Sequence, residues 1–221
     1  MTFQRARSSE QRETRRQAIL DTAAAMLEEL PVAELSLNEL SRRVGLAKSN
    51  VLRYFETREA VLLELLDDYL GKWLAVVAEK LDEGVTPDAV QEARAEQVAA
   101  ILSCSLADQT VLCDLVGAQG GVLERNVSVE VVKRYKRASL TKLGDMSKLV
   151  RQHLPEIGDG AQWFCFLTLL AAGALATYTP TPPSLLAAYA DEPALGVLHL
   201  DMDDALRRAI TSVLLGALPR T

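Results

Sequence analysis

The sequence predicts an all-α protein, and three observations support this fold class. Of the 221 residues, 49% are hydrophobic and 24% are charged, while only 12 are Gly and 8 are Pro. Alanine and leucine dominate and β-branched and aromatic residues are fewer, a composition that favours helices. Apolar residues recur at spacings of three and four, and no stretch alternates as a half-buried strand would. The length fits one large domain, or a small domain joined to a larger one.

The first predicted helix ends near Leu30. Ser8 is placed to act as its N-cap, with Gln11 reaching back as in a capping box. From Ile19 to Leu30 the apolar residues share one face, and Pro31 is a natural stop. We therefore expect one amphipathic helix in this region.

Two short helices are predicted next, on either side of a glycine. Ser36 and Glu39 form an S-x-x-E capping box, and Gly45 ends the helix that the box starts. A third helix is predicted from about Ala47 to about Phe55. This arrangement is the helix-turn-helix pattern, in which glycine adopts a positive φ at no steric cost. The third helix carries side chains that can donate hydrogen bonds to phosphates or base edges: Lys48, Ser49, Asn50, Arg53 and Tyr54.

The rest of the chain is predicted to be helical as well. Thr57 can cap a long fourth helix over about residues 57–80, which connects two domains. We divide the chain into an N-terminal three-helix DNA-binding domain with a basic arm (1–56) and a C-terminal helical domain (57–221). Further helices are expected over about 87–103, 106–123, 128–153, 159–178, 185–189 and 203–217, with a proline-rich break at 179–183.

The net charge of −6 is unevenly distributed along the chain. Residues 1–58 hold 10 Lys/Arg and 8 Asp/Glu, whereas residues 59–221 hold 14 and 22. Positive charge is thus concentrated at one end, as a DNA-facing unit requires. Five arginines near the N-terminus fit either a disordered arm that reaches DNA or a solubilising tail: Arg5, Arg7, Arg12, Arg15 and Arg16. A second basic cluster at residues 133–137 is expected to be a solvated helix face.

The segment from Leu37 to Val61, LNELSRRVGLAKSNVLRYFETREAV, resembles the DNA-binding domain of the TetR/AcrR family. Helix spacing, turn glycine, terminal aromatic and the start of the next helix all align, and the resemblance extends over residues 8–75. Four positions depart from the usual pattern: Ala47 where a capping Ser or Thr is common, Leu52 where Tyr is frequent, Tyr54 where His is common, and Arg58 in place of Lys.

The resemblance implies a transcriptional regulator that binds a palindromic operator in double-stranded DNA as a homodimer. The predicted DNA contacts are Ser36, Lys48, Ser49, Asn50, Arg53, Tyr54 and Arg58. Two recognition helices one turn of DNA apart would match the two halves of a palindrome. The resemblance further implies dimerisation through helices 159–178 and 203–217. We expect a repressor that an unknown small-molecule effector releases from its operator by a population shift.

The effector site is only weakly indicated by the sequence. Dispersed aromatic and mixed polar residues of the helical domain are candidates to line it: Trp73, Cys104, Cys113, Gln119, Tyr135, Trp163 and Phe166. Each aromatic also fits an ordinary core position. A mostly apolar pocket would favour a lipophilic or aromatic ligand.

Other classes of function receive little support. No catalytic motif is present, and His153 and His199 have no partner at metal-ligand spacing, so neither enzyme activity, nor a cofactor, nor a metal is expected. The three cysteines and the arginine-rich start predict reduced, buried thiols in a cytoplasmic protein without a signal peptide. The uncharged residues 161–178 predict a buried helix rather than a membrane span. Two alternatives stay open: an effector-independent architectural DNA binder, and a ligand-binding module or enzyme that has lost DNA binding.

Overall fold

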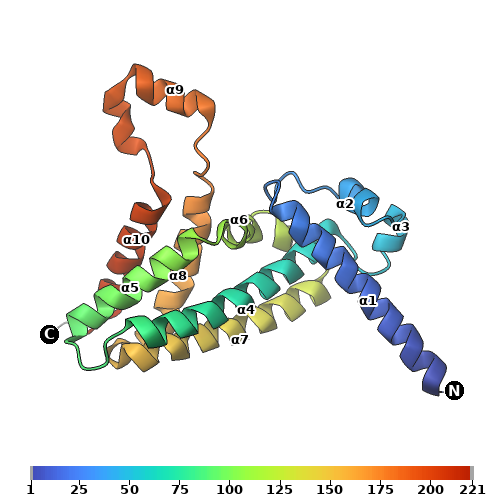
Figure 1. Ribbon diagram of the computed structural model, residues 1–221, viewed down its shortest axis with the longest axis horizontal. Coiled ribbons are helices and arrows are strands. Elements are labelled where there is room, and N and C mark those ends of the chain that lie inside the picture. The colour runs from blue at the N-terminus through green and yellow to red at the C-terminus, as the bar shows by residue number, and fades with distance from the viewer. Residues whose placement is uncertain (1, 220–221) are drawn as a thin grey trace.

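The computed structural model describes residues 2–219, with side chains from Glu10 onward, and confirms the all-α fold, since no strand occurs in that range. Figure 1 shows an elongated arrangement with the N-terminal helices at one end. The helices are α1 (Thr2–Leu27), α2 (Leu37–Arg43), α3 (Lys48–Val51), α4 (Arg58–Gly84), α5 (Gln91–Ala107), α6 (Thr110–Gln119), η1 (Leu123–Arg125), α7 (Val129–His153), η2 (Pro155–Ile157), α8 (Gly160–Ala176), α9 (Pro183–Asp191), η3 (Pro193–Leu198) and α10 (Met202–Ala217).

The N-terminal unit consists of α1, α2 and α3 packed against the start of α4. Leu40 of α2, Val51 of α3 and Phe55 are buried together with Ile19 and Met26 of α1. These are apolar positions at helical spacing, and burying them fixes the angle between the short helices, which are too short to be stable alone.

The first helix differs from its prediction at both ends. It begins at Thr2, so Ser8 is not its N-cap, and the expected disordered arm is wrong because residues 2–16 continue the helix. Its regular part ends at Leu27, before the predicted stop, and the amide of Leu30 closes the end by donating to the carbonyl of Met26 at 3.0 Å.

Later helix starts also shift. The expected helix at Pro87 begins only at Gln91, because residues 86–89 form a turn in which the Thr86 amide donates to the Gln97 side chain at 3.0 Å. In contrast, Thr57 caps its helix as predicted, and its side chain accepts a hydrogen bond from the Ala60 amide. Ser128 caps α7 in the same way and accepts from the Val131 amide.

The C-terminal domain is built from α4 to α8 and α10. Helices α4 and α7 lie side by side, and α8 packs between α6 and α10 (Figure 1). The α6–α8 crossing brings two glycines together, since a Cβ on Gly173 would lie 2.7 Å from the backbone nitrogen of Gly117. Only residues without a side chain allow these two backbones so close.

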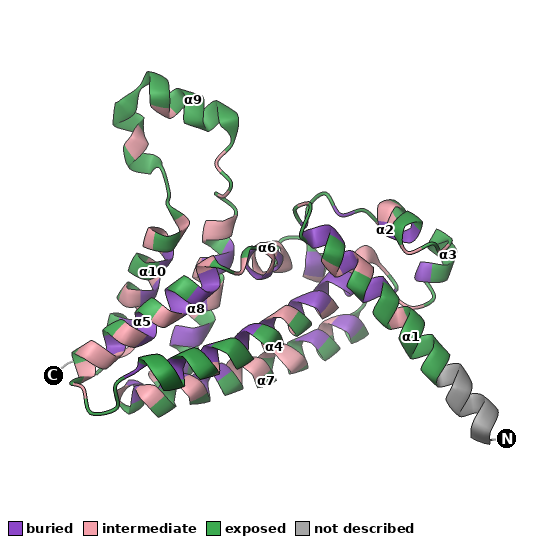
Figure 2. Ribbon diagram, in the orientation of Figure 1, coloured by how far each residue is buried: buried purple, intermediate pink, exposed green. Residues whose placement is uncertain are grey.

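Helix α9 and η3 form a projection, residues 179–201, that stands away from the body (Figures 1 and 2). The helix spans nine residues, longer than the predicted 185–189, and packs mainly on η3. No residue from 177 to 201 is buried. The projection therefore contributes nothing to the core of the chain that carries it.

Among the described residues, no single helix has the length and apolarity needed to cross a bilayer. Helices α5 and α6 reach that length and composition only when taken together, and they are bent by 89° at the break between them.

Candidate nucleic-acid interface and ligand pocket

The helix-turn-helix is fixed by one cap and one glycine. Ser36 accepts a hydrogen bond from the Glu39 amide at 3.2 Å, as the capping box predicts. Gly45 has φ +70°, a conformation that L side chains rarely adopt. The chain turns there, and the Leu46 amide donates to the Ser41 carbonyl at 3.0 Å. These bonds set the direction in which the third helix leaves the turn.

The third helix presents a polar exposed side. Lys48, Ser49 and Asn50 are all exposed, while Val51 is completely buried beneath them. Regular helix covers only Lys48–Val51, but backbone hydrogen bonds continue the turn to Phe55, where the prediction placed its end. Ala47 stands at the N-cap of this helix, and its methyl group cannot accept a hydrogen bond. The first amides of the helix therefore receive no cap from the Ala47 side chain.

The remaining predicted DNA contacts lie at the edges of this surface. Ser36 and Arg53 are exposed, and Tyr54 is half-buried against the core. Leu52 follows Val51 and is 41% exposed, so an apolar side chain lies on a surface that would contact DNA better with a polar one. The exposed side of the third helix is thus polar at its start and mixed at its end.

Arg58 does not stand free for a phosphate. Its guanidinium donates a hydrogen bond to the carbonyl of Val32, and the side chain is only 21% exposed. The amide of Val32 in turn donates to the carboxylate of Asp114 at 2.7 Å. Arg58 thus ties the start of α4 to the α1–α2 loop, which α6 holds from the other side, and its contact with DNA stays a prediction.

Arg16 also has a structural role instead of the predicted one in an arm. It forms an ion pair with Glu64 of α4, and its guanidinium carbon lies 4.9 Å from the centre of the Phe55 ring. It joins α1, α4 and the end of the third helix. The side chains of Arg5 and Arg7 lie outside the described ones, so their predicted contacts stay untested.

The arginines of α2 are neutralised by carboxylates. Arg42 donates to Glu39 through two nitrogens at 2.8 and 2.6 Å, and Arg43 pairs with both Glu39 and Glu29. The hydrogen bond from Arg42 is the main cause that lowers the pKa of Glu39 to about 2, and the hydrogen bond from Arg43 is the second. These ion pairs reduce the positive charge that the two arginines offer to a phosphate.

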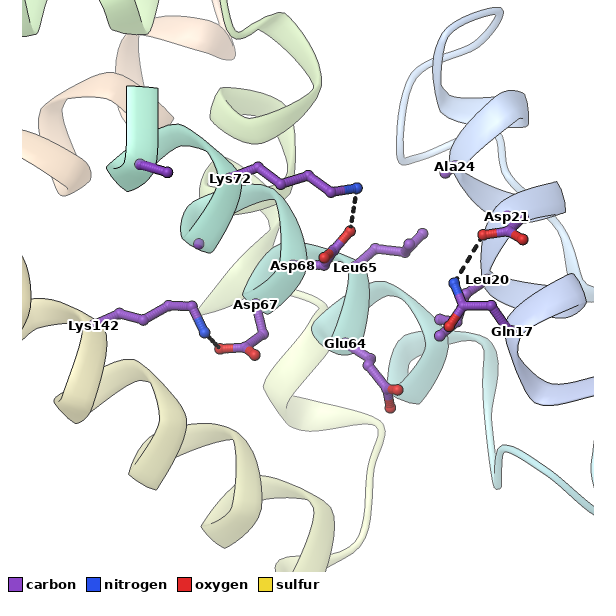
Figure 3. A pocket seen from close by; sticks show the side chains of 12 residues that line it. Gln17, Leu20, Asp21, Ala24, Glu64, Leu65, Asp67, Asp68, Lys72 and Lys142 are labelled. Atoms are coloured by element: carbon purple, nitrogen blue, oxygen red, sulfur yellow. Dashed lines mark hydrogen bonds and ion pairs between the residues drawn. The ribbon is translucent and has the colours of Figure 1, made fainter. Parts of the chain in front are cut away.

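A polar hollow of about 650 Å³ lies where α1 meets α4 and α7 (Figure 3). Its carboxylates are largely engaged: Lys142 reaches Asp67 at 2.6 Å, and Lys72 reaches Asp68 at 2.7 Å. Four acidic side chains line it against two lysines: Asp21, Glu64, Asp67 and Asp68. Acidic side chains outnumber basic ones in this lining, which disfavours a phosphate there.

A second, mostly apolar pocket of about 410 Å³ opens among α4, α6, α7 and α8. Its polar end is formed where Gln119 and Lys136 both donate to Glu124, each at 2.6 Å. Burial raises the pKa of Tyr135 to about 12, so the phenol stays neutral. The pocket is lined by Leu66, Leu70, Val116, Gln119, Gly120, Glu124, Tyr135, Lys136, Ser139, Leu140, Leu143, Phe166, Leu169 and Leu170.

Three of the seven predicted ligand residues line this pocket: Gln119, Tyr135 and Phe166. The other four do not line it, and their contact with a ligand stays a prediction. Trp73 is 2% exposed and donates its indole N–H to Ser105 at 3.2 Å inside the core. Cys113 is buried and lies 3.4 Å from the Leu106 carbonyl. Cys104 is exposed on α5, contrary to the expected burial, and Trp163 is 62% exposed.

The outer side of α8 is apolar and uncovered in this chain. Trp163 and Phe166 contact each other with ring centroids 5.5 Å apart, and Leu170 continues the same side. Leu215 of α10 is 61% exposed. Large apolar side chains gathered outside on neighbouring helices are typical of a protein–protein interface.

Two family models match the chain. The model described as "Bacterial regulatory proteins, tetR family" matches residues 19–65. The model described as "Tetracyclin repressor-like, C-terminal domain" matches residues 67–221, more than half of the chain. The protein belongs to the TetR family. The family description, bacterial regulatory proteins, agrees with the function that the helix-turn-helix predicts.

Curated relatives of this TetR-family regulator match in the DNA-binding region only. It is 44% identical over 50 residues to the HTH-type transcriptional regulator EthR of Mycobacterium tuberculosis, covering 23% of each chain. The EthR of Mycolicibacterium smegmatis is 40% identical over 58 residues, covering 26% of this chain and 27% of its own. The chain therefore matches about a quarter of the length of these proteins.

Solved structures extend the likeness to the whole fold of this TetR-family member. FadR of Thermus thermophilus, determined with lauroyl-CoA, has a TM-score of 0.57 at 17% identity, covering 93% of this chain and 96% of its own. FadR of Bacillus subtilis, determined with stearoyl-CoA, has a TM-score of 0.54 at 13% identity, covering 92% and 99%. At these identities the likeness shows the shared fold alone.

Proposed function

We propose that this regulator is a homodimeric repressor that binds a palindromic operator and is released by a small-molecule effector. One observation carries the DNA contact: Lys48, Ser49 and Asn50 are exposed together on a segment whose other side is fixed by buried Val51. Asn suits a bidentate contact to adenine, and Lys suits guanine or a phosphate in the major groove.

The dimer is supported by the apolar outer side of α8 and α10. Burying Trp163, Phe166 and Leu170 against the same side of a second copy would remove a large apolar area from water. A twofold axis between two copies of α8 and α10 makes such a contact self-complementary. The resulting dimer also provides the two recognition helices that a palindrome requires.

The effector is proposed to be a mostly apolar molecule with a polar end. The pocket offers an apolar wall from α4 and α8, and polar groups at Gln119 and Lys136. The FadR proteins with this fold were determined with lauroyl-CoA and with stearoyl-CoA. We take a long acyl chain as the first ligand to test, because such a chain suits an apolar wall.

The DNA contact is tested by selecting duplexes from a random library and then measuring the affinity of variants for the selected sequence. Lys48→Ala and Asn50→Ala are each expected to weaken binding by about 1–3 kcal/mol, which is about 5- to 150-fold. Arg137→Ala removes an exposed arginine from α7 and is the matched control, expected to change affinity less than about twofold.

If all three substitutions changed the DNA affinity equally, the exposed side of the third helix would not be the DNA-contacting surface. A library that yields bound duplexes without a common motif would favour the architectural alternative. A protein that retains no duplex even at low salt would favour the ligand-binding module.

The pocket is tested by titrating the protein with lauroyl-CoA and following thermal unfolding. A ligand that binds the folded state raises Tm by mass action. Ser139→Glu places a carboxylate in the mostly apolar pocket, where its desolvation is unfavourable, and should weaken binding at least about tenfold. Thr141→Glu adds the same group on the exposed side of α7 and should leave the shift unchanged. Equal shifts in both variants would place the ligand elsewhere.

A further inference from the structure

A basic hollow of about 460 Å³ lies between α1 and the end of the third helix. Two of its arginines, Arg12 and Arg15, are three residues apart on α1 and so share one helix face. Arg53 and Tyr54 approach from the turn that follows α3, and Gln11 completes the wall. The hollow therefore joins two segments far apart in sequence, and every side chain in it has at least one N–H or O–H donor.

The three arginines of this hollow are not compensated within the chain. Among the side chains from residue 10 onward, none of the three has a carboxylate within 4.0 Å, and no Asp or Glu lines the hollow. Elsewhere in the same range, arginines are commonly paired with carboxylates: Arg16, Arg42, Arg43, Arg58, Arg94, Arg207 and Arg208. Three guanidinium groups that converge without a counter-charge repel one another, and an anion would relieve that repulsion.

We propose that this hollow binds a phosphate of the DNA backbone, and that Arg53 is a phosphate contact instead of a base contact. The inference rests on the proposed DNA binding and adds a site on α1 to it. Arg53 follows exposed Asn50 by three residues, so a duplex held at the third helix brings its backbone to this side of the domain. Guanidinium groups bind phosphate oxygens through two parallel hydrogen bonds.

A DNA phosphate fits the position better than a free phosphate ligand does. The hollow lies at the surface, and four of its five lining residues offer only polar or charged groups. The fifth, Tyr54, has its ring half-buried against the core, so its hydroxyl is the group best placed to contact a phosphate. Contacts of this kind carry no sequence information but fix the orientation of the protein on the duplex. The site therefore determines how the third helix meets the groove.

The salt dependence of binding distinguishes a phosphate contact from a base contact. Affinity for the selected duplex is measured between about 50 and 200 mM salt for wild type, Arg12→Ala/Arg15→Ala, Arg53→Ala and the control Arg137→Ala. Each phosphate contact contributes about 0.9 to the slope of log K against log salt, so a dimer that loses one per subunit should lose about 1.8. Both hollow variants should show this loss, while the affinity ratio between selected and scrambled duplexes stays constant.

Slopes equal to wild type in both hollow variants would overturn the inference while leaving the proposed function in place. A reduced affinity ratio for Arg53→Ala, with an unchanged slope, would make Arg53 a base contact and also overturn it. Calorimetry with inorganic pyrophosphate tests the other source of phosphate. Tight binding that requires Arg12 and Arg15, in a protein that retains no duplex, would overturn both the DNA assignment and the proposed function. Circular dichroism confirms that each variant is folded.

Discussion

Gly173→Ala should destabilise the protein by about 1–3 kcal/mol, because overpacking at a rigid contact costs that much. A Cβ at this position would lie 2.7 Å from the Gly117 nitrogen, 2.8 Å from a Val116 methyl carbon and 2.9 Å from the Val116 carbonyl carbon. Two of these three atoms belong to the backbone of α6, so no side-chain rotation relieves the clash. The helices must move apart, and packing around the crossing is lost.

Urea unfolding followed by circular dichroism measures the effect. Gly144→Ala is the matched control, because Gly144 also lies within a helix but a Cβ there meets nothing within 4 Å. Alanine is the better helix former, so this control should be neutral or more stable by up to about 1 kcal/mol. If Gly173→Ala were as stable as the control, the close α6–α8 approach would be refuted. Val116 of α6 and Leu169 of α8 line the apolar pocket. Moving the two helices apart by Gly173→Ala should therefore also alter binding of the proposed acyl ligand.

Trp73→Ala should destabilise the protein by about 3–5 kcal/mol, the usual result of emptying a large core site. The Trp73 ring is 2% exposed, and its N–H donates to Ser105. Removing the ring leaves a cavity and also leaves the Ser105 hydroxyl without this donor, although that hydroxyl still donates to the Leu102 carbonyl at 3.0 Å. Equilibrium denaturation gives the change in the free energy of unfolding.

Phe166→Ala provides the contrasting aromatic. Phe166 is 39% exposed at the pocket, so its removal leaves no enclosed cavity and should cost less than about 1.5 kcal/mol in the isolated subunit. Measurement at low protein concentration limits any contribution from dimerisation. Comparable losses for the two substitutions would mean that Trp73 is not the core residue its burial indicates.

The DNA-binding end of the molecule could be predicted closely from the sequence. Ser36, Glu39 and Gly45 each act over three or four residues of chain, so local rules suffice to place the cap and the turn. The exposed Lys48 and Asn50 follow from that placement. The hydrogen bond from Arg58 could not be predicted, because its partner, Val32, lies in a loop that is held by Asp114 of α6, far away in the sequence.

The ligand pocket could be predicted only in part. Trp73 and Phe166 carry the same signal in the sequence, an aromatic on an apolar helix, yet one lies in the core and the other at the pocket. The difference arises from how α4, α6, α7 and α8 cross, which no local pattern encodes. The basic hollow was missed as a unit for the same reason, because Arg12 and Arg53 come together only through tertiary packing.

The placement of the DNA-binding unit at one end of an elongated molecule has an electrical consequence (Figure 1). Residues 1–58 carry more basic than acidic side chains, and the remainder carries 22 acidic against 14 basic ones. Charges of opposite sign at two ends give the subunit a permanent dipole moment. In the field around a duplex that dipole experiences a torque, which turns the basic end toward the phosphates before any contact forms. Diffusional encounters would then be oriented ones, and the acidic end would discourage the reversed approach.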